Sequence, residues 1–313
     1  MLNEERKQVF LNQNRFETFE SGSMINITKT INIFGNYEDV CGKDICDWSI
    51  ADIKEALISV NSKSIGSVRN YISHMKYYTD WCIKNGLSKI NQNNYSNITM
   101  QMMNEVVNSA LLEKQLITRE YLLERMEPLL NSRDKFLLLA LYEGIGGAKL
   151  CEIVEMKRKD INHDTKTVLL CTGRNFKMSD QLYDFAVDSA SSTDYYVRRN
   201  STKTEDGIIV YKRNEDDLES VYWALQKGII DDNKHRGIIQ SIKRVNKSIG
   251  LQTMTTRAYN RAGRYWYIKK IADKEGISVL ECEKKHEEEI NKIYGAMSIA
   301  TKYNWYEFLK QLE

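Results

Sequence analysis

The chain has 313 residues, with 45 Lys and Arg against 43 Asp and Glu, a single Pro and 42% hydrophobic residues. This length predicts about two domains, each able to bury its own core, and the composition excludes a disordered or fibrous protein. The formal net charge of only +2 argues against a nucleic-acid-binding protein until the positions of the charges are considered.

The sequence gives no sign of export or of a membrane span. Its first residues, MLNEERKQVF, mix charges and lack the apolar core of a signal peptide. The longest purely apolar run, 136–142, is far shorter than the roughly 20 residues of a membrane-spanning helix. The six Cys include no C-x-x-C pair, so we expect reduced thiols. We therefore expect a cytoplasmic protein without disulfides, metal, cofactor or membrane partner.

The first 112 residues are expected to form a small helical domain. Ser49 can cap a helix whose apolar residues run from Ile53 to Val60. A longer helix over Ser64–Asn85 has apolar residues at three-and-four spacing and a left-handed stop at Asn85-Gly86. After a polar, irregular stretch, Met100–Leu112 predicts a further helix.

A second domain is expected over residues 118–313. Thr118 can cap its first helix, Ser132 opens the next, and Gly144–Gly147 breaks that helix. A short helix over Lys149–Met156 follows.

A hairpin is expected next, because KTVLLC at 166–171 precedes the turn residues 172–175 and a return at 176–178. Helices then dominate, apart from the strand-like Gly207–Tyr211. An aromatic-rich helix closes the chain at Lys302–Leu312, and the sequence does not choose whether it packs on its own domain or on a neighbour. The predicted fold class is mainly α with a small β-sheet.

The near-neutral total hides an uneven distribution of charge. The 37 residues of Lys234–Lys270 contain ten Lys or Arg and no Asp or Glu. A weaker basic stretch, Asn61–Lys89, holds five Lys or Arg and one acid, whereas acids gather at Glu215–Glu219 and Glu281–Glu289. A charge run is usually a solvated helix face, but such a face normally mixes signs to form i,i+4 pairs. Because a polyanion would offset the self-repulsion, two basic stretches in two domains predict a clamp around nucleic acid.

Residues 147–161, GAKLCEIVEMKRKDI, resemble the G-x-R-x-x-E box of the tyrosine recombinases, the phage integrase family. The spacing of Glu152 and Asp160 matches the box, and Lys63–Tyr71 resembles the family's first-domain helix. The resemblance implies an N-terminal helical, SAM-like core-binding domain (1–112) and an integrase-like, catalytic-type domain (118–313).

The catalytic positions of that family are changed in this chain. Lys149 stands at the first arginine, and Arg174, with Lys177 as a second candidate, at the hairpin lysine. Residues 255–260 (TTRAYN) place Arg257 at a histidine and Asn260 at the second arginine, with Arg261 or Arg264 as an alternative register. The later Gly-His appears as Gly295-Ala296, and Tyr303 lies near the nucleophile's position, where core packing among other aromatics is the alternative explanation.

These changes keep positive charge but lose the titratable imidazole and the bidentate forks. Arg cannot exchange protons near neutral pH, and an Arg-to-Lys change at a bidentate phosphate site is not conservative. Because each such loss commonly costs roughly 10²–10⁴-fold in rate, negligible DNA cleavage is expected. The four His match no metal spacing.

The resemblance thus implies a DNA-binding protein on a recombinase scaffold with a lost active site. The chain is also similar to the master repressors of SPbeta-type prophages, which implies a sequence-specific transcription regulator that maintains lysogeny on double-stranded DNA. A protein antirepressor or self-association would be a further partner. The alternatives are a divergent active recombinase using Tyr303 and a protein-binding module with an acidic partner. The residues expected to contact DNA are Lys63, Ser64, Arg69, Asn70 and Lys76 in the first domain and Lys149, Arg174, Lys177, Lys243, Arg244, Arg257, Asn260, Arg261 and Arg264 in the second.

Overall fold

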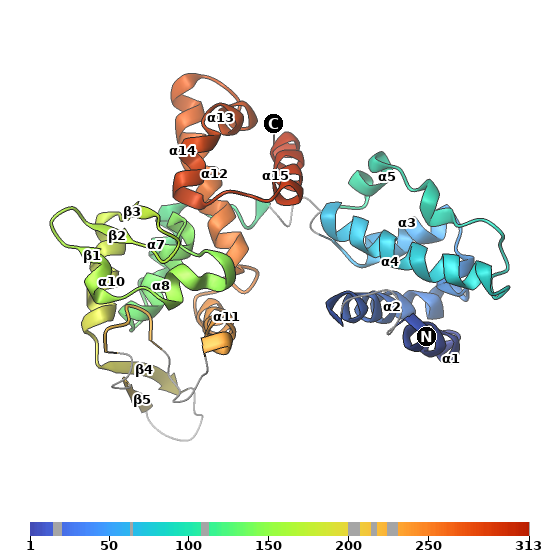
Figure 1. Ribbon diagram of the computed structural model, residues 1–313, viewed down its shortest axis with the longest axis horizontal. Helices are drawn as coiled ribbons and strands as arrows, with labels where there is room; N and C mark the ends of the chain where they lie inside the picture. Colours follow the sequence, from blue (N-terminus) through green and yellow to red (C-terminus); the bar gives the residue numbers. More distant parts are fainter. Residues whose placement is uncertain are drawn as a thin grey trace. The chain divides into compact units, whose positions relative to one another are not determined.

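The computed structural model describes residues 1–14, 21–62, 65–107, 113–199, 207–213, 218–223 and 231–312. Packing divides the chain into two compact units (Figure 1). One comprises Met1–Glu113 together with Tyr303–Gln311, and the other is built on Lys114–Lys302. The first break lies beside the end predicted at residue 112.

The first unit is helical. Ser49 caps α3 and forms a capping box with Asp52. The helix therefore begins at Ile50, three residues before the predicted apolar run. The long helix expected from residue 64 is α4, and its buried face includes Val68, Met75 and Tyr78. The elements are α1 (Glu4–Asn14), α2 (Ser21–Cys41), η1 (Ile45–Asp47), α3 (Ile50–Ser59), α4 (Ile65–Lys84), η2 (Asn94–Asn97) and α5 (Met100–Glu105).

The helix predicted over Met100–Leu112 is shorter than expected. α5 ends at Glu105, and residues 108–112 lie outside the described residues. Lys63 and Ser64 also lie outside them.

The second unit combines helices with two small antiparallel sheets. Its helices begin at side-chain caps such as Thr118 and Ser179. The elements are α7 (Arg119–Met126), α8 (Ser132–Glu143), η3 (Ala148–Leu150), α9 (Cys151–Val154), η4 (Arg158–Asp160), β1 (Ile161–Asn162), β2 (Thr167–Leu169), β3 (Asn175–Lys177), α10 (Asp180–Ser191), β4 (Asp194–Arg199), β5 (Gly207–Lys212), α11 (Asp231–Ser248), α12 (Thr256–Glu275), α13 (Val279–Lys285) and α14 (Glu287–Tyr294).

The predicted hairpin is present as β2 and β3, with Val168 opposite Phe176, and β1 adds a third strand at Ile161 opposite Val168. The strand-like run at residue 207 is β5, but its partner β4 was not predicted. β4 has the sequence DYYVRR, and its charged ends interrupt the apolar alternation that indicates a strand; among its described side chains, 194–197, Tyr195 alone is buried.

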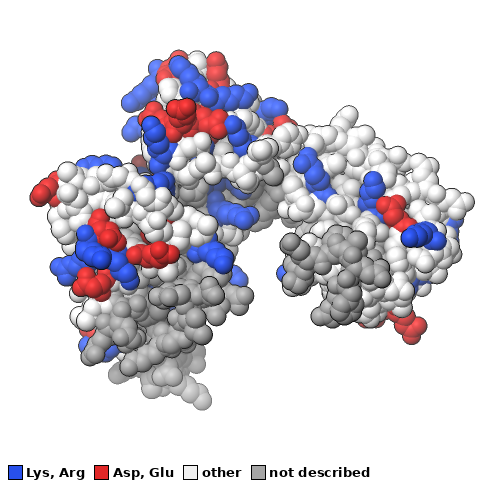
Figure 2. Space-filling model, in the orientation of Figure 1, with Lys and Arg blue, Asp and Glu red and all other residues white. Residues whose placement is uncertain are grey.

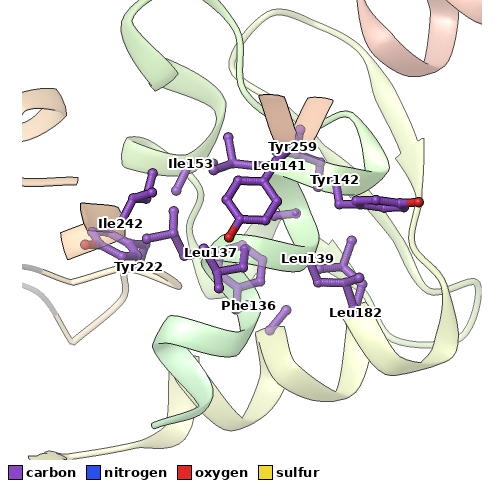
Figure 3. Packing of buried hydrophobic residues seen from close by; sticks show 14 of the residues in the cluster. Phe136, Leu137, Leu139, Leu141, Tyr142, Ile153, Leu182, Tyr222, Ile242 and Tyr259 are labelled. Carbon is purple, nitrogen blue, oxygen red and sulfur yellow. The ribbon is translucent and has the colours of Figure 1, made fainter. Parts of the chain in front are cut away.

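The core of the second unit surrounds α8. All side chains from Phe136 to Tyr142 are buried, and Figure 3 shows Leu137 and Leu139 of α8 among Leu182 of α10, Ile242 of α11 and Tyr259 of α12. α12 approaches α8 closely at Gly263, where an added Cβ would overlap the carbonyl oxygen of Tyr142. A helix buried on all sides is thus the scaffold on which the basic helix α12 rests.

The last helix, α15 (Ile299–Leu312), groups mostly with the first unit, which is one of the two packing partners that the sequence left open. Residues Tyr303–Gln311 group with the first unit, although 118–313 was expected to form one domain. Trp305, Phe308 and Leu309 are buried, and Asn304 lies so close to Gly66 of α4 that a Cβ there would be 2.9 Å from its amide nitrogen. An apolar helical pattern shows that a face is buried, not which domain buries it.

Among the described residues, no helix combines the length and apolar character that crossing a membrane requires.

We predict that Gly263→Ala destabilises the protein by about 3 kcal/mol, because the backbone of α8 cannot move away from the added methyl group. Gly146→Ala is the control, since its Cβ would meet only side-chain atoms at 4.0 Å. Urea denaturation of both variants measures the difference. Equal stability of the two would contradict the close packing of α12 on α8.

Candidate nucleic-acid interface

The N-terminal end of α12 carries two of the predicted cations on one face. Thr255 caps the helix by accepting a hydrogen bond from the backbone N–H of Ala258. Arg257 is exposed, whereas Asn260 and Arg261 are partly buried. Burial and then the neighbouring charge of Arg257 lower the pKa of the Arg261 guanidinium. Like charges four residues apart destabilise a helix, so an anion bound here would relieve their repulsion.

A hydrogen-bonded corner positions this end of α12. Asn246, at the end of α11, accepts a hydrogen bond from the Tyr259 hydroxyl at 2.6 Å and donates one to the Met254 carbonyl at 2.7 Å. All three groups are buried. Arg125 donates to the Ile249 carbonyl at 2.7 Å and so closes the corner from α7. The corner is therefore fixed by the fold.

α11 presents further cations beside this corner. Its apolar face, Ile238, Ile242 and Val245, is buried, while Lys243 and Lys247 are exposed on the other side. Lys247 was not among the predicted contacts, although its four-residue spacing from Lys243 is a helical signal that could have identified it.

One predicted side chain near these cations, Arg244, has less freedom. Arg244 donates to the Tyr195 hydroxyl at 2.8 Å and also lies over that ring. The side chains of Lys234 and Arg236, at the start of the basic stretch, lie outside the described residues.

Lys149 is held in an unusual backbone conformation. Lys149 and Leu150 are both left-handed, with φ of 52° and 61°, which costs non-glycine residues roughly 1–2 kcal/mol each. Gly147, with φ of 70°, starts the turn, and the backbone N–H of Gly146 donates to Glu152 at 2.8 Å. The turn leaves Lys149 exposed. Strain of this kind is kept where the surrounding structure holds it in place, often at functional sites.

Glu152 and Arg174 form the central ion pair of the second unit, and this changes the role expected for Arg174. The buried Glu152 carboxylate accepts hydrogen bonds from Arg174 Nε at 2.8 Å and Nη2 at 2.6 Å, and from the Thr172 hydroxyl at 2.6 Å. Nη2 also donates to the Gly144 carbonyl, and Nη1 to the carbonyls of residues 292 and 293. All five N–H donors are therefore used within the protein, and none is left for a phosphate.

Arg264 also differs from its expected role. It is 3% exposed and forms a charge-assisted pair with the fully buried Glu283. It donates further hydrogen bonds to Asn291 at 3.0 Å and to the Gly295 carbonyl at 3.3 Å. A guanidinium enclosed in this way stabilises the α12–α14 packing and is not accessible to DNA, so we exclude it from the candidate interface.

Lys177 is exposed at the end of β3 and donates to the Thr165 carbonyl across the hairpin. In the first unit, Arg69, Asn70 and Lys76 are exposed along α4. Arg69 lies over the Tyr303 ring, 5.5 Å from its centroid.

The described histidines and Tyr303 are the candidates for proton transfer or nucleophilic attack, and each has a partner other than the cations of α11 and α12. Among the described imidazoles, His163 bonds to Tyr183, His74 to Thr30 and His286 to Glu275. Burial lowers the pKa of His74. The His235 side chain lies outside the described residues. Tyr303, the candidate nucleophile, is 41% exposed and belongs by packing to the first unit.

The surface of the second unit is not uniformly basic. Figure 2 shows Lys and Arg intermixed with Asp and Glu where α13 and α14 lie, whereas the visible face of the first unit is mostly uncharged. Over the part of the chain that the structure describes, no group of three or more His, Cys, Asp or Glu could hold a metal ion. The candidate interface, named the α11–α12 cation face below, consists of Lys243 and Lys247 of α11 and Arg257, Asn260 and Arg261 of α12. Lys149, in the turn before α9, is a further candidate for a DNA contact.

Two domain models of one protein family, MrpR, match this chain. The MrpR N-terminal core-binding domain matches residues 1–84, and the MrpR C-terminal catalytic domain matches residues 116–312. The SPbeta prophage-derived uncharacterized protein YopR of Bacillus subtilis (strain 168) is 25% identical over 223 residues, which are 69% of this chain. The match spans 66% of YopR, just under two thirds of its length.

Among solved structures, a lambda integrase(75–356) dimer bound to a COC' core site is similar with a TM-score of 0.45 and 13% identity. The match covers 96% of this chain and 94% of that one.

We predict that Arg264→Leu lowers the free energy of unfolding by about 3–5 kcal/mol, because Glu283 would keep a buried, unpaired charge. Arg257→Leu removes an exposed charge from the same helix and should change stability by no more than about 0.5 kcal/mol. Urea denaturation measures both. A small effect of Arg264→Leu would contradict its structural role.

Glu152 should make stability depend on acid pH. Burial favours a higher pKa for this carboxyl, but hydrogen bonds from Arg174, Thr172 and Gly146 and the Arg174 charge outweigh burial and lower the pKa below its usual 4.5. A carboxyl with a lowered folded pKa stabilises the fold above its unfolded pKa, and this contribution is lost as pH falls through the folded value. We therefore expect Glu152→Gln to flatten the decline in stability below about pH 4.5.

The measurement is the urea midpoint of the original protein and the variant across that pH range. Glu288→Gln, at an exposed position of α14, is the control and should leave the decline unchanged. An unaltered decline in Glu152→Gln would show that the pair does not carry this dependence.

Proposed function

The chain belongs to the MrpR family, with the core-binding and catalytic domains of a tyrosine recombinase-like, integrase-like protein, and we propose that it binds double-stranded DNA without cutting it. In this proposal it is a sequence-specific transcription regulator, and specifically a prophage lysogeny repressor. The prophage origin of YopR, a relative at 25% identity, supports the proposed role as a prophage repressor.

One observation carries the proposal: among the described residues, the exposed cations of the second unit have no proton-transfer group hydrogen-bonded to them. Lys149 and Arg257 are exposed on the second unit, and no described histidine is hydrogen-bonded to either of them. Cations of this kind hold phosphates and release counterions when they do so. Neither residue supplies an imidazole, the side chain that most often relays protons near neutral pH.

The geometry around Glu152 supports the loss of cleavage. In the related recombinases, cationic groups must reach the scissile phosphate. Arg174, the residue at the hairpin-lysine position, has all its donors committed to Glu152 and to backbone carbonyls. Stabilisation of a phosphate transition state needs donors aimed at the phosphate oxygens.

A repressor function gives binding by itself a biological effect, since occupying an operator requires affinity and not chemistry. Contacts to phosphate position such a protein, and contacts to base edges give it specificity. Asn260, partly buried between Arg257 and Arg261, is our candidate for a base-edge contact, because an amide can bond to adenine in a bidentate manner. Self-association or a protein antirepressor would then regulate occupancy.

The experiment that tests the function is recovery of the DNA that the protein occupies across a genome that carries its gene. Sites upstream of genes are the expected result, whereas sites confined to attachment junctions would favour a recombinase. A nicked duplex provides the second test. A covalent protein–DNA adduct that Tyr303→Phe abolishes would overturn the proposal, and undetectable duplex binding at low salt would favour a protein partner instead.

We predict that Arg257→Gln weakens binding to a recovered duplex by about 1.5 kcal/mol, roughly tenfold in Kd, and lowers the salt-dependence slope by about 1. Lys274→Gln is the matched control, because it removes an exposed charge from the same helix about 25 Å away at ~1.5 Å per residue. Fluorescence anisotropy over a salt series measures both. Equal loss in the two variants would indicate a general charge effect and not a site.

A further inference from the structure

Arg69 and Tyr303 form a contact in the first unit to which the proposed function gives no role. Residues Tyr303–Gln311 of α15 group with that unit, and Arg69 lies on its helix α4. The guanidinium carbon of Arg69 is 5.5 Å from the centroid of the Tyr303 ring, which is a cation–π distance. Tyr303 is 41% exposed, and Arg69 is exposed as well. The pair therefore lies at the surface, where a ligand can reach it.

The packing of α15 on α4 places the ring over the guanidinium. Gly66 makes room for Asn304, whose amide nitrogen would be only 2.9 Å from an added Cβ. Gly66 precedes Arg69 by three residues, about one helical turn, and Asn304 follows Tyr303 directly. Trp305, the next residue of α15, is buried and anchors the helix. The position of the ring is thus set by the fold before any ligand binds.

The ring restrains Arg69 without using its hydrogen-bond donors. A guanidinium carries five N–H donors, and the ring attracts its charge electrostatically through the π face. Among the described residues, no ion pair or hydrogen bond commits the donors of Arg69 to an acceptor. Arg174 and Arg264 differ in this, because their donors serve buried carboxylates of the second unit. Arg69 therefore keeps donors for an anionic ligand.

Arg69 belongs to a polar, positively charged face of α4. Ser73 and Lys76 follow it at intervals of four and three residues, so the three side chains share one side of the helix. All three are exposed. The only acid of α4, Asp80, lies eleven residues beyond Arg69, about 16 Å away at ~1.5 Å per residue. A face of this composition suits contacts to the phosphate backbone of DNA.

We propose that Tyr303 is a positioning residue: its ring orients Arg69 for a contact to a DNA phosphate, and its hydroxyl has no part in that contact. This role rests on the proposed function, since it assigns a phosphate contact to the first unit. An exposed arginine loses rotamer freedom when it binds a ligand. Because the ring already restricts Arg69 in the free protein, part of that entropy cost is removed from the binding step.

The experiment is a double-mutant cycle on Arg69 and Tyr303, measured by fluorescence anisotropy with a duplex recovered from the genome. Arg69→Gln should weaken binding roughly tenfold, the loss of one charge-assisted contact. Tyr303→Leu should weaken it about two- to fivefold, the value of an exposed cation–π contact. In the Arg69→Gln protein, Tyr303→Leu should cause no further loss, because the ring acts only through Arg69.

Tyr303→Phe is the matched control, since it keeps the ring and removes only the hydroxyl. It should bind with the affinity of the original protein, whereas a loss equal to that of Tyr303→Leu would overturn the proposal and indicate a direct role of the hydroxyl. Tyr303→Gln, a second variant without a ring, should reproduce the loss of Tyr303→Leu. Urea denaturation of each variant shows whether it is folded under the binding conditions.

The outcomes separate this role from the proposed function. If the original protein binds a duplex and the losses of the two single variants multiply in the double variant, the ring acts independently of Arg69, and the positioning role alone is overturned. If the original protein binds no duplex, the proposed function fails, and the positioning role fails with it.

Discussion

The second unit depends on the pairing of one buried carboxylate with one guanidinium. Glu152 is 1% exposed, and a charge enclosed to that extent requires an opposite charge and a full set of hydrogen bonds. Arg174 supplies both, and its remaining donors reach the carbonyls that end α8 and α14. One interaction therefore joins four segments: the end of α8, the start of α9, the β2–β3 turn and the end of α14. The Lys149 turn is held in its strained conformation because these segments cannot move apart.

Burial divides the cations of the second unit into two classes. Arg174 and Arg264 lie among buried acids and carbonyls, where they stabilise the fold. Lys149 of η3, Lys243 of α11 and Arg257 of α12 are exposed to solvent. The division follows from the low dielectric constant of the interior, where an unpaired charge is costly. An exposed cation is solvated by water and remains able to pair with a phosphate.

Under the proposed function, the same division would account for a recombinase scaffold that holds DNA without cleaving it. Cleavage needs donors directed at one phosphate, a group that exchanges protons and a nucleophile in a single site. In this chain the donors of Arg174 serve the fold, the described histidines are engaged elsewhere, and Tyr303 lies against Arg69 of α4. Binding requires less, because each exposed cation contributes through its own phosphate contact.

Local structure and the scaffold follow from residues that lie close together in the sequence. Capping residues such as Ser49, the helical spacing of α4 and the turn chemistry of the hairpin act over a few residues, so they could be recognised before any fold was known. The G-x-K-x-x-E box likewise placed Glu152. Three features became evident in the folded chain alone: α15 packs largely with the first unit, β4 pairs with β5, and particular arginines are buried. Each of these depends on contacts between residues far apart in sequence, and an arginine that pairs with Glu283 has the same local signature as one that faces solvent.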